Sequence, residues 1–186
     1  MIVSAGKNET FSFATPIGVG LIESAMNLTR ICISDKPDTL LFIGSAGSYG
    51  ENEIFDIVES SSAANIELSF VENNSYTPIE SVLKSEDQKL SDDTIVNSSN
   101  YITINEKLGK KYLEYGMGIE NMEFYSVVKI AQEFQIPVRG IFVVTNKTDQ
   151  NAHQDFISNH NKAMDELIAH LEKQKIIVPH GTMEDI

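Results

Sequence analysis

The chain contains one cysteine, two arginines and no tryptophan among its 186 residues. The single cysteine, Cys32, cannot form an internal disulfide and is typical of a reducing compartment. Acidic residues outnumber basic ones 27 to 14, and the net charge of −13 argues against binding to nucleic acid, whose phosphates require basic side chains. The apolar runs are too short to cross a bilayer, and the first residues lack the pattern of a signal peptide. We therefore expect a cytoplasmic protein with neither nucleic acid nor membrane as a partner.

The rest of the composition is that of an ordinary globular protein. Hydrophobic residues make up 41% of the chain and charged residues 22%, so a packed core is expected. The length suits one domain with a substantial core. We expect a single domain over residues 1–174, followed by a C-terminal tail at residues 175–186.

The spacing of apolar residues predicts strands that alternate with helices. Short, continuous apolar runs are typical of strands buried on both faces, and a 3–4 residue period is typical of helices. We expect strands at residues 1–5, 39–43, 54–59, 66–71, 101–104 and 138–145, and helices at residues 16–33, 105–116, 120–134 and 155–173. Residues 44–50 are predicted to form a small-residue loop, and residues 72–97 an irregular acidic surface segment. This alternation indicates an α/β domain with helices on both faces of the sheet.

Two common motifs are incomplete. The Gly-Val-Gly at residues 18–20 begins like a dinucleotide-binding turn, but Glu23 stands where the third glycine is needed. His153 and His160 have no cysteine or carboxylate at metal-binding spacing, so we expect surface histidines and no metal site.

Three short segments, taken in order, carry a resemblance. The first runs from residue 36 to 47, the second is Asn121-Met122-Glu123, and the third runs from residue 136 to 149. Together they resemble the nucleoside phosphorylase and nucleosidase family, which includes purine nucleoside phosphorylases and methylthioadenosine/adenosylhomocysteine nucleosidases. The resemblance implies a three-layer α/β fold with a mixed central sheet flanked by helices, and a homo-oligomer. It also implies a small nucleoside or purine as the partner and no cofactor, with phosphate as the co-substrate in the phosphorylases.

The Gly-Ser-Ala-Gly sequence at residues 44–47 follows a predicted strand. Backbone N–H groups and a hydroxyl at such a position can bind an anion or a water, and small side chains let a flat base approach the backbone. The resemblance implies that Ala46 and Gly47 contact the base and that Ser45 contacts phosphate or the attacking water. The alternative is a glycine-rich turn that only allows two elements to pack.

Met122 and Glu123 match a Met-Glu pair of the family. There the glutamate binds the ribose hydroxyls and the methionine packs on the sugar. A carboxylate suits a diol because it accepts two O–H donors. The alternative is that Glu123, at the start of a helix, only interacts favourably with the helix dipole.

Asn146 stands where many family members have an aspartate that helps to protonate purine N7. An asparagine cannot act as an acid, but its amide can donate to N7 and to a 6-oxo group, which favours hypoxanthine- or guanine-like bases. The resemblance also places Tyr101 and Ile102 near the segment that stacks over the base, and Phe156 at the opposite wall. For these three residues, core packing is an equal alternative, and for Asn146 the alternative is a turn at a strand end.

The resemblance breaks near the N-terminus, where family members have a longer section with a β-hairpin. An ungapped placement puts Glu9 where nucleosidases have the glutamate that activates water, although Glu9 could equally be a surface residue. Phosphorylases hold phosphate with cations, but the family's arginine position falls at Phe142, and Arg139 lies three residues earlier. The sequence therefore favours hydrolysis over phosphorolysis.

The resulting hypothesis is an enzyme that cleaves the N-glycosidic bond of a 6-oxopurine-like nucleoside, by phosphorolysis or hydrolysis. Asn146 and Glu9 are its candidate catalytic residues. The alternative is a nucleoside- or purine-binding member of the same fold that does not catalyse the reaction. A third hypothesis, a purely structural subunit, predicts no pocket between Ser45, Glu123 and Asn146.

Overall fold

The computed structural model describes residues 1–85 and 94–178. Of the tail expected at 175–186, residues 179–186 lie outside this range. The helices are α1 (Gly20–Asp35), α2 (Leu68–Val71), α3 (Glu106–Glu114), α4 (Phe124–Glu133) and α5 (Ala152–Lys173). The strands are β1 (Ile2–Ser4), β2 (Thr15–Pro16), β3 (Leu40–Ser48), β4 (Ile57–Ser60), β5 (Ser62–Ala64), β6 (Val82–Lys84), β7 (Ile95–Ser98), β8 (Met117–Asn121) and β9 (Val138–Lys147). Within the described ranges, no helix has the length and apolar character needed to cross a membrane.

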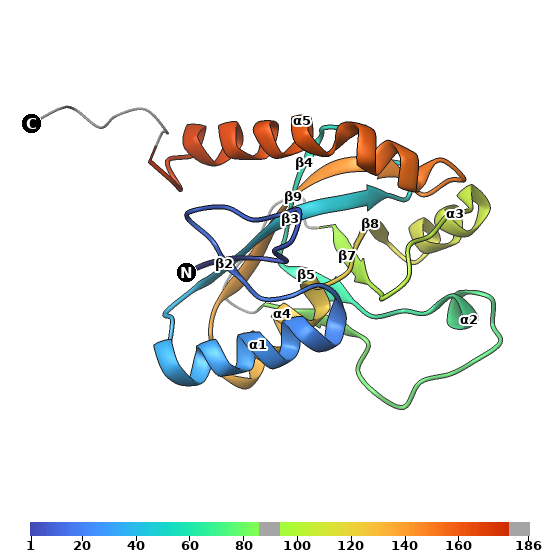
Figure 1. The fold of residues 1–186 in the computed structure, drawn as a ribbon. Helices are drawn as coiled ribbons and strands as arrows, with labels where there is room; N and C mark the ends of the chain where they lie inside the picture. The colour runs from blue at the N-terminus through green and yellow to red at the C-terminus, as the bar shows by residue number, and fades with distance from the viewer. Residues whose placement is uncertain (86–93, 179–186) are drawn as a thin grey trace, which may run out of the picture.

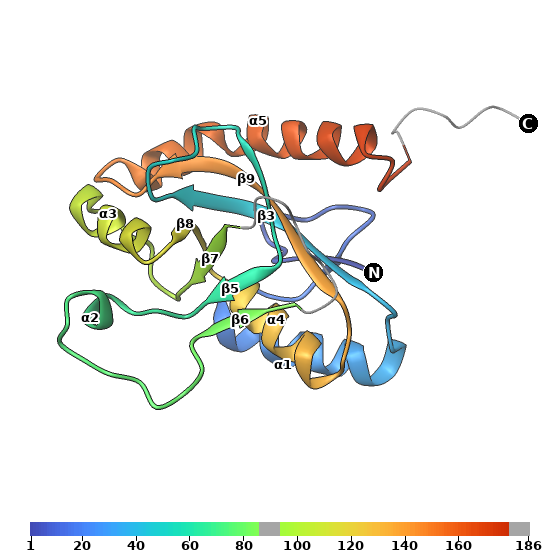
Figure 2. The same ribbon diagram turned by 180° about the vertical axis from the view of Figure 1, so that it is seen from behind.

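The strands form one mixed sheet with helices on both faces. Its main path runs β2-β1-β3-β8-β7-β5-β6, and β9 pairs with β3 and β4. The pairs β1–β3 and β3–β9 are parallel, whereas β3–β8 and β4–β9 are antiparallel. Helix α5 covers one face, and α1 and α4 lie together on the other (Figures 1 and 2). The predicted three-layer α/β fold with a mixed central sheet is confirmed.

Strand β3 divides the core between these two faces because successive side chains point to opposite sides of a strand. Leu40 and Phe42 belong to the cluster that includes residues of α1 and α4. Leu41 and Ile43 belong to the cluster that includes Leu167 of α5. Both clusters are buried, which explains why β3 appears in the sequence as a continuous apolar run rather than an alternating one.

Two strands, β1 and β8, pair with the same edge of β3, and the part of the edge between them is unpaired. Strand β1 pairs with β3 as far as Phe42, and β8 pairs with it from Gly47 onward. The backbone of Ser45 therefore lies between the two partners on that edge. Since a strand backbone needs hydrogen-bond partners, Ser45 is available to groups other than a neighbouring strand.

Three predicted boundaries in the first half of the chain are wrong. Residues 44–48 are not a loop but the second half of β3, because β9 continues to pair with them up to Ser48. The first helix begins at Gly20 rather than residue 16, because Thr15 and Pro16 pair with β1. Residues 66–71 do not form a strand; the strand is β5, and Leu68–Val71 is a helical turn.

The second half of the chain shows similar differences. The segment predicted to be irregular, residues 72–97, contains β6 and most of β7. Residues 101–104 are not a strand but part of the loop that follows β7. The helix predicted from residue 120 begins at Phe124, because Met117–Asn121 is a central strand buried along its length. The predicted cap of α3 is confirmed, since the Asn105 side chain accepts hydrogen bonds from the N–H groups of Lys107 and Leu108.

Candidate functional site

A pocket of about 310 Å³ opens at the gap in the edge of β3. All ten residues that the sequence proposes for a nucleoside site line it: Glu9, Ser45, Ala46, Gly47, Tyr101, Ile102, Met122, Glu123, Asn146 and Phe156. They come from the turn after β1, from β3, β9 and the loop after β7, from the β8–α4 junction, and from α5. The third hypothesis, a purely structural subunit, predicted no pocket between Ser45, Glu123 and Asn146, and that prediction is wrong.

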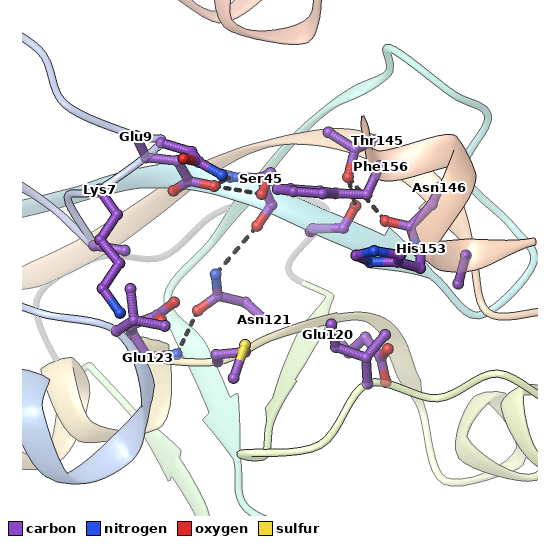
Figure 3. A pocket seen from close by; sticks show the side chains of 18 of the residues that line it. Lys7, Glu9, Ser45, Glu120, Asn121, Glu123, Thr145, Asn146, His153 and Phe156 are labelled. Carbon is purple, nitrogen blue, oxygen red and sulfur yellow. Dashed lines mark hydrogen bonds between the residues drawn. The ribbon is translucent and has the colours of Figure 1, made fainter. Parts of the chain in front are cut away.

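Glu9 and Ser45 form one wall of the pocket (Figure 3). Glu9 Oε1 accepts hydrogen bonds from the backbone N–H of Ser45, at 3.1 Å, and from the Ser45 hydroxyl. Its other oxygen, Oε2, is buried and has no hydrogen-bond partner in the described part of the chain. Burial raises the pKa of Glu9, while the hydrogen bonds from Ser45 oppose that rise.

A tight turn holds Glu9 in place. The N–H of Glu9 donates to the carbonyl of Gly6, and the Ser4 hydroxyl donates to the carbonyl of Glu9. Gly6 has a φ of +83°, and a Cβ there would lie 2.9 Å from Pro16 Cβ, so the turn requires glycine. Glu9 is only 8% exposed, which makes the alternative of a surface glutamate wrong.

Glu123, which also lines the pocket, connects two helices. Its Oε1 accepts a hydrogen bond from the N–H of Gly20, at 2.8 Å, where α1 begins. Burial raises the pKa of Glu123 to about 7, and the nearby Glu9 carboxylate adds to the rise. The carboxylate thus stabilises the N-terminus of α1.

Asn121 is a site residue that the sequence reasoning did not assign to any role. Its Nδ2 donates to the carbonyl of Ser45 at 3.1 Å, and its Oδ1 accepts from the N–H groups of Glu123 and Phe124. Asn121 therefore fills the gap on the edge of β3 and fixes the first turn of α4. Asn121 is part of the Asn-Met-Glu segment found in the sequence, but its role can be inferred only from the pairing of β8 with β3, which brings it next to Ser45.

Asn146 lines the pocket near the end of β9. Its Oδ1 accepts the hydroxyl of Thr145 at 2.9 Å, and its Nδ2 donates to the carbonyl of Lys147 at 3.1 Å. The amide carries two N–H donors, so one remains available to a ligand. A Cβ added to Gly47 would lie 3.0 Å from Nδ2 of Asn146, which places the amide directly over the glycine.

Aromatic and apolar side chains form the remaining walls. Tyr101 is 85% exposed and Ile102 is 52% exposed, so neither is a core residue, contrary to one alternative. Phe156 on α5 packs against His160 in a tilted arrangement, with ring centroids 5.0 Å apart. His160 Nε2 donates to the carbonyl of Asn8 at 2.9 Å, so this histidine anchors the turn that carries Glu9 rather than lying free on the surface.

The charged groups of the pocket are mostly acidic. Glu9, Glu120 and Glu123 all line it, and Lys7 is the one basic side chain besides His153 among the described lining residues. The Lys7 side chain extends toward Glu123 (Figure 3). Both arginines lie elsewhere: Arg139 pairs with Glu59 at 3.2 Å, and Arg30 donates to Asn27. Within the described residues, no group of three His, Cys, Asp or Glu side chains could hold a metal ion.

Comparison with known proteins addresses the fold and the family. Residues 90–173 match the family described as "Phosphorylase superfamily". Among solved structures, a mutant of the 5′-methylthioadenosine/S-adenosylhomocysteine nucleosidase of Helicobacter pylori superposes with a TM-score of 0.77 at 15% identity, covering 94% of this chain and 96% of that one. The resemblance to the nucleoside phosphorylase and nucleosidase family is confirmed.

Two further structures have the family fold. The futalosine hydrolase of H. pylori has a TM-score of 0.77 at 14% identity and covers 94% of this chain and 96% of its own. The nucleosidase of Streptococcus pneumoniae has a TM-score of 0.72 at 15% identity, with 91% and 95% covered. No curated protein sequence matches the chain. At these identities the structures establish the fold alone, and the roles of individual residues remain predictions.

Proposed function

We propose that the chain hydrolyses the N-glycosidic bond of a purine nucleoside and prefers a 6-oxopurine base. The observation that carries this proposal is the arrangement of Glu9. Glu9 lines the pocket, Ser45 holds one of its carboxylate oxygens, and the other oxygen is buried without a hydrogen-bond partner among the described residues. A general base needs a positioned carboxylate that can accept a proton from water, and we assign that task to Glu9.

In the proposed reaction, a water oxygen forms a bond to ribose C1′ while the bond from C1′ to purine N9 breaks. The Glu9 carboxylate takes one proton of the water. The electron pair of the broken bond passes to the purine, which then takes a proton from solvent, since Asn146 has none to give. The products are the free sugar and the free base.

Asn146 supports the departure of the purine through hydrogen bonding. Because its Oδ1 already accepts the Thr145 hydroxyl, the group left for a ligand is an N–H donor. Purine N7 and a 6-oxo oxygen both accept hydrogen bonds, and both gain negative charge as the bond to the sugar breaks. An amide donor therefore suits a 6-oxopurine better than a 6-aminopurine, whose amino group needs an acceptor.

Glu123 and Met122 are proposed to hold the ribose. The fixed Oε1 of Glu123 orients the carboxylate, so that Oε2 can accept the sugar hydroxyls. Holding the sugar in this way places C1′ relative to Glu9, which is the main contribution that positioning makes to such a reaction.

Hydrolysis is favoured over phosphorolysis by the contacts of Ser45. Its N–H and hydroxyl are the donors that would hold a phosphate, and both already bond to the Glu9 carboxylate. A phosphate would have to displace that carboxylate in a pocket that also contains Glu120 and Glu123. The net charge of −13 further opposes the approach of an anion.

The related structures support a nucleoside ligand of this general kind. The H. pylori nucleosidase mutant contains 5′-methylthioadenosine in its active site, and another member of the fold is a futalosine hydrolase. We retain as parts of the proposal the homo-oligomer that the resemblance implies and the cytoplasmic location expected from the sequence. Light scattering coupled to size exclusion tests the oligomer directly.

The proposal is tested by incubating the purified chain with inosine, guanosine, adenosine and 5′-methylthioadenosine, each with and without phosphate. Chromatography identifies the free base, and a reducing-sugar assay separates ribose from ribose 1-phosphate. We expect base and free sugar without phosphate, and faster release from inosine and guanosine. Product that appears only with phosphate would make the chain a phosphorylase, and a ligand that raises Tm without any product would make it a binding protein.

A further inference from the structure

We propose that Glu120 is a positioning residue that clamps the loop carrying Tyr101 and Ile102 onto the sheet, and thereby sets the affinity for the purine. This inference rests on the proposed function. Glu120 lies in β8 beside Gly47 of β3, and it lines the pocket. No role for it follows from the three sequence segments that carry the family resemblance.

The loop that carries Tyr101 and Ile102 is fixed only weakly by packing. Residues 99–105 connect β7 to α3 without regular structure. Tyr101 is 85% exposed and Ile102 is 52% exposed, so neither side chain is fixed by packing in the core. A loop with such exposed apolar side chains needs polar anchors if it is to keep one arrangement over a pocket.

The loop has an anchor on each side of these two residues. On the first side, Asn100 Oδ1 accepts the N–H of Leu21 at 3.0 Å and attaches the loop to α1. On the second side, Glu120 accepts two hydrogen bonds from one residue. Its Oε1 accepts the N–H of Thr103 at 2.9 Å, and its Oε2 accepts the hydroxyl of Thr103 at 2.7 Å. Both bonds are to a carboxylate, the acceptor that forms the stronger class of hydrogen bond.

Glu120 also lies close to two buried aromatic residues of the core. The nearby Tyr49 hydroxyl lowers the pKa of Glu120 against the effect of burial, and Asn97 Nδ2 donates to that hydroxyl at 3.2 Å. The Tyr49 ring stacks on Tyr112 with centroids 4.7 Å apart, and both rings are buried. The Glu120 carboxylate therefore lies beside a packed part of the core, and this packing limits its movement and that of the loop attached to it.

The clamp gives a reason for the buried Glu120 carboxylate in a pocket that is already acidic, at the end proposed to bind the purine base. Figure 3 places Glu120 on the opposite side of the pocket from Glu9 and nearer to the base-binding Asn146 than Glu123 is. Because both oxygens of Glu120 serve Thr103, its effect on a ligand passes through the loop. The expected consequence is on binding of the base and much less on the chemistry at C1′.

The test compares Thr103→Val, Thr103→Ser and the matched control Thr29→Val. Thr29 is half-buried like Thr103, and its hydroxyl also donates a 2.7 Å hydrogen bond, but on α1, to the carbonyl of Ala25. We expect Thr103→Val to raise KM for the nucleoside about tenfold while kcat changes less, as loss of one hydrogen bond to a charged acceptor predicts. Thr103→Ser, which restores the hydroxyl, should return KM to within about threefold of the wild type, like Thr29→Val.

A second measurement needs no turnover. Amide hydrogen exchange over residues 99–105, without ligand, should be faster in Thr103→Val than in the wild type and slow again in Thr103→Ser. This result would support the clamp even if the wild type hydrolysed no nucleoside, so failure of the proposed function is distinguishable from failure of the clamp. Unchanged exchange in Thr103→Val would overturn the clamp.

A double-mutant cycle separates the clamp from direct contact between Glu120 and the base. If Glu120 acts through Thr103, the double variant Thr103→Val with Glu120→Ala should raise KM no more than Glu120→Ala alone. Two results would show that Glu120 contacts the ligand itself. One is that the effects of the two substitutions on KM add up; the other is that KM is unchanged in Thr103→Val but raised in Glu120→Ala. Should Glu120→Ala fail to fold, the Thr103 series still decides the question.

Discussion

Glu9 Oε1 accepts both donors of Ser45, its backbone N–H and its hydroxyl, and this one pair joins the turn after β1 to the centre of β3. The pair is possible only because β1 and β8 leave the edge of β3 open at this point. It occupies donors that could otherwise bind a phosphate. In the proposed function, this gap in strand pairing is the reason that the pocket favours water over phosphate as the nucleophile.

Glu9→Gln is expected to reduce hydrolysis by a factor of about 10² to 10⁴, the usual contribution of a general base. The amide oxygen can still accept from Ser45, so the fold and ligand binding should be kept. Steady-state release of the base measures the rate, and the ligand-induced rise in Tm measures binding. The control is Glu51→Gln, an exposed glutamate that does not line the pocket. An unaltered rate in Glu9→Gln would remove Glu9 from the mechanism.

Asn146→Ala is expected to abolish turnover of inosine, because the donor to N7 and O6 is lost. Asn146→Asp should move preference toward adenosine, since a carboxylate accepts from a 6-amino group. The ratio of kcat/KM for inosine and adenosine is the quantity to measure in both variants. A ratio that stays constant in Asn146→Asp would show that this residue does not read the base.

The sequence predicts the three layers well because the signals of the main strands and helices are local, and the family resemblance selects ten residues that line one pocket. Buried strands such as β3 and β9 are continuous apolar runs, and helices such as α5 have a clear apolar period, so both can be found from single segments. The ten proposed residues come from short motifs at the ends of those elements. Their placement around one pocket needs no long-range information beyond the order of the strands.

The errors arise where tertiary pairing decides local structure. Residues 44–48 contain Gly, Ser and Ala and are predicted to form a loop, yet β9 makes them a strand. Met117–Asn121 is merged with a helix because its role as a central strand depends on β3 and β7 as partners. Asn121 and Glu120 are missed for the same reason, since their functions are contacts to Ser45 and Thr103, which are distant in sequence.

The stability of the folded chain should fall as pH rises from about 4.5 to about 7, because the pKa of Glu123 is raised from 4.5 to about 7. In this window the folded state binds more protons than the unfolded state, so the free energy of unfolding decreases with pH. The raised pKa values of Glu9 and Glu120 act in the same direction. Urea unfolding at about pH 5 and about pH 7.5 measures the difference.

Glu123→Gln should remove its share of this pH dependence, up to about 3 kcal/mol, because an amide does not titrate. Glu51→Gln, with an exposed side chain, should leave the slope unchanged. If the slope of Glu123→Gln equalled that of the wild type, the buried carboxylate would not be the source of the effect.

Two glycines of β3 should separate the chemical step from base binding. A Cβ at Gly44 would lie 2.7 Å from Glu9 Oε2, so Gly44→Ala should displace the carboxylate proposed as the general base and lower kcat with a smaller change in KM. A Cβ at Gly47 would lie 3.0 Å from Asn146 Nδ2 and 3.2 Å from Glu120 Cγ, so Gly47→Ala should raise KM instead. The comparison is made on kcat and KM for inosine in both variants. Both variants add the same methyl group to the same strand. An identical effect of the two on kcat and KM would therefore indicate general damage to β3 and would contradict separate sites for water and base.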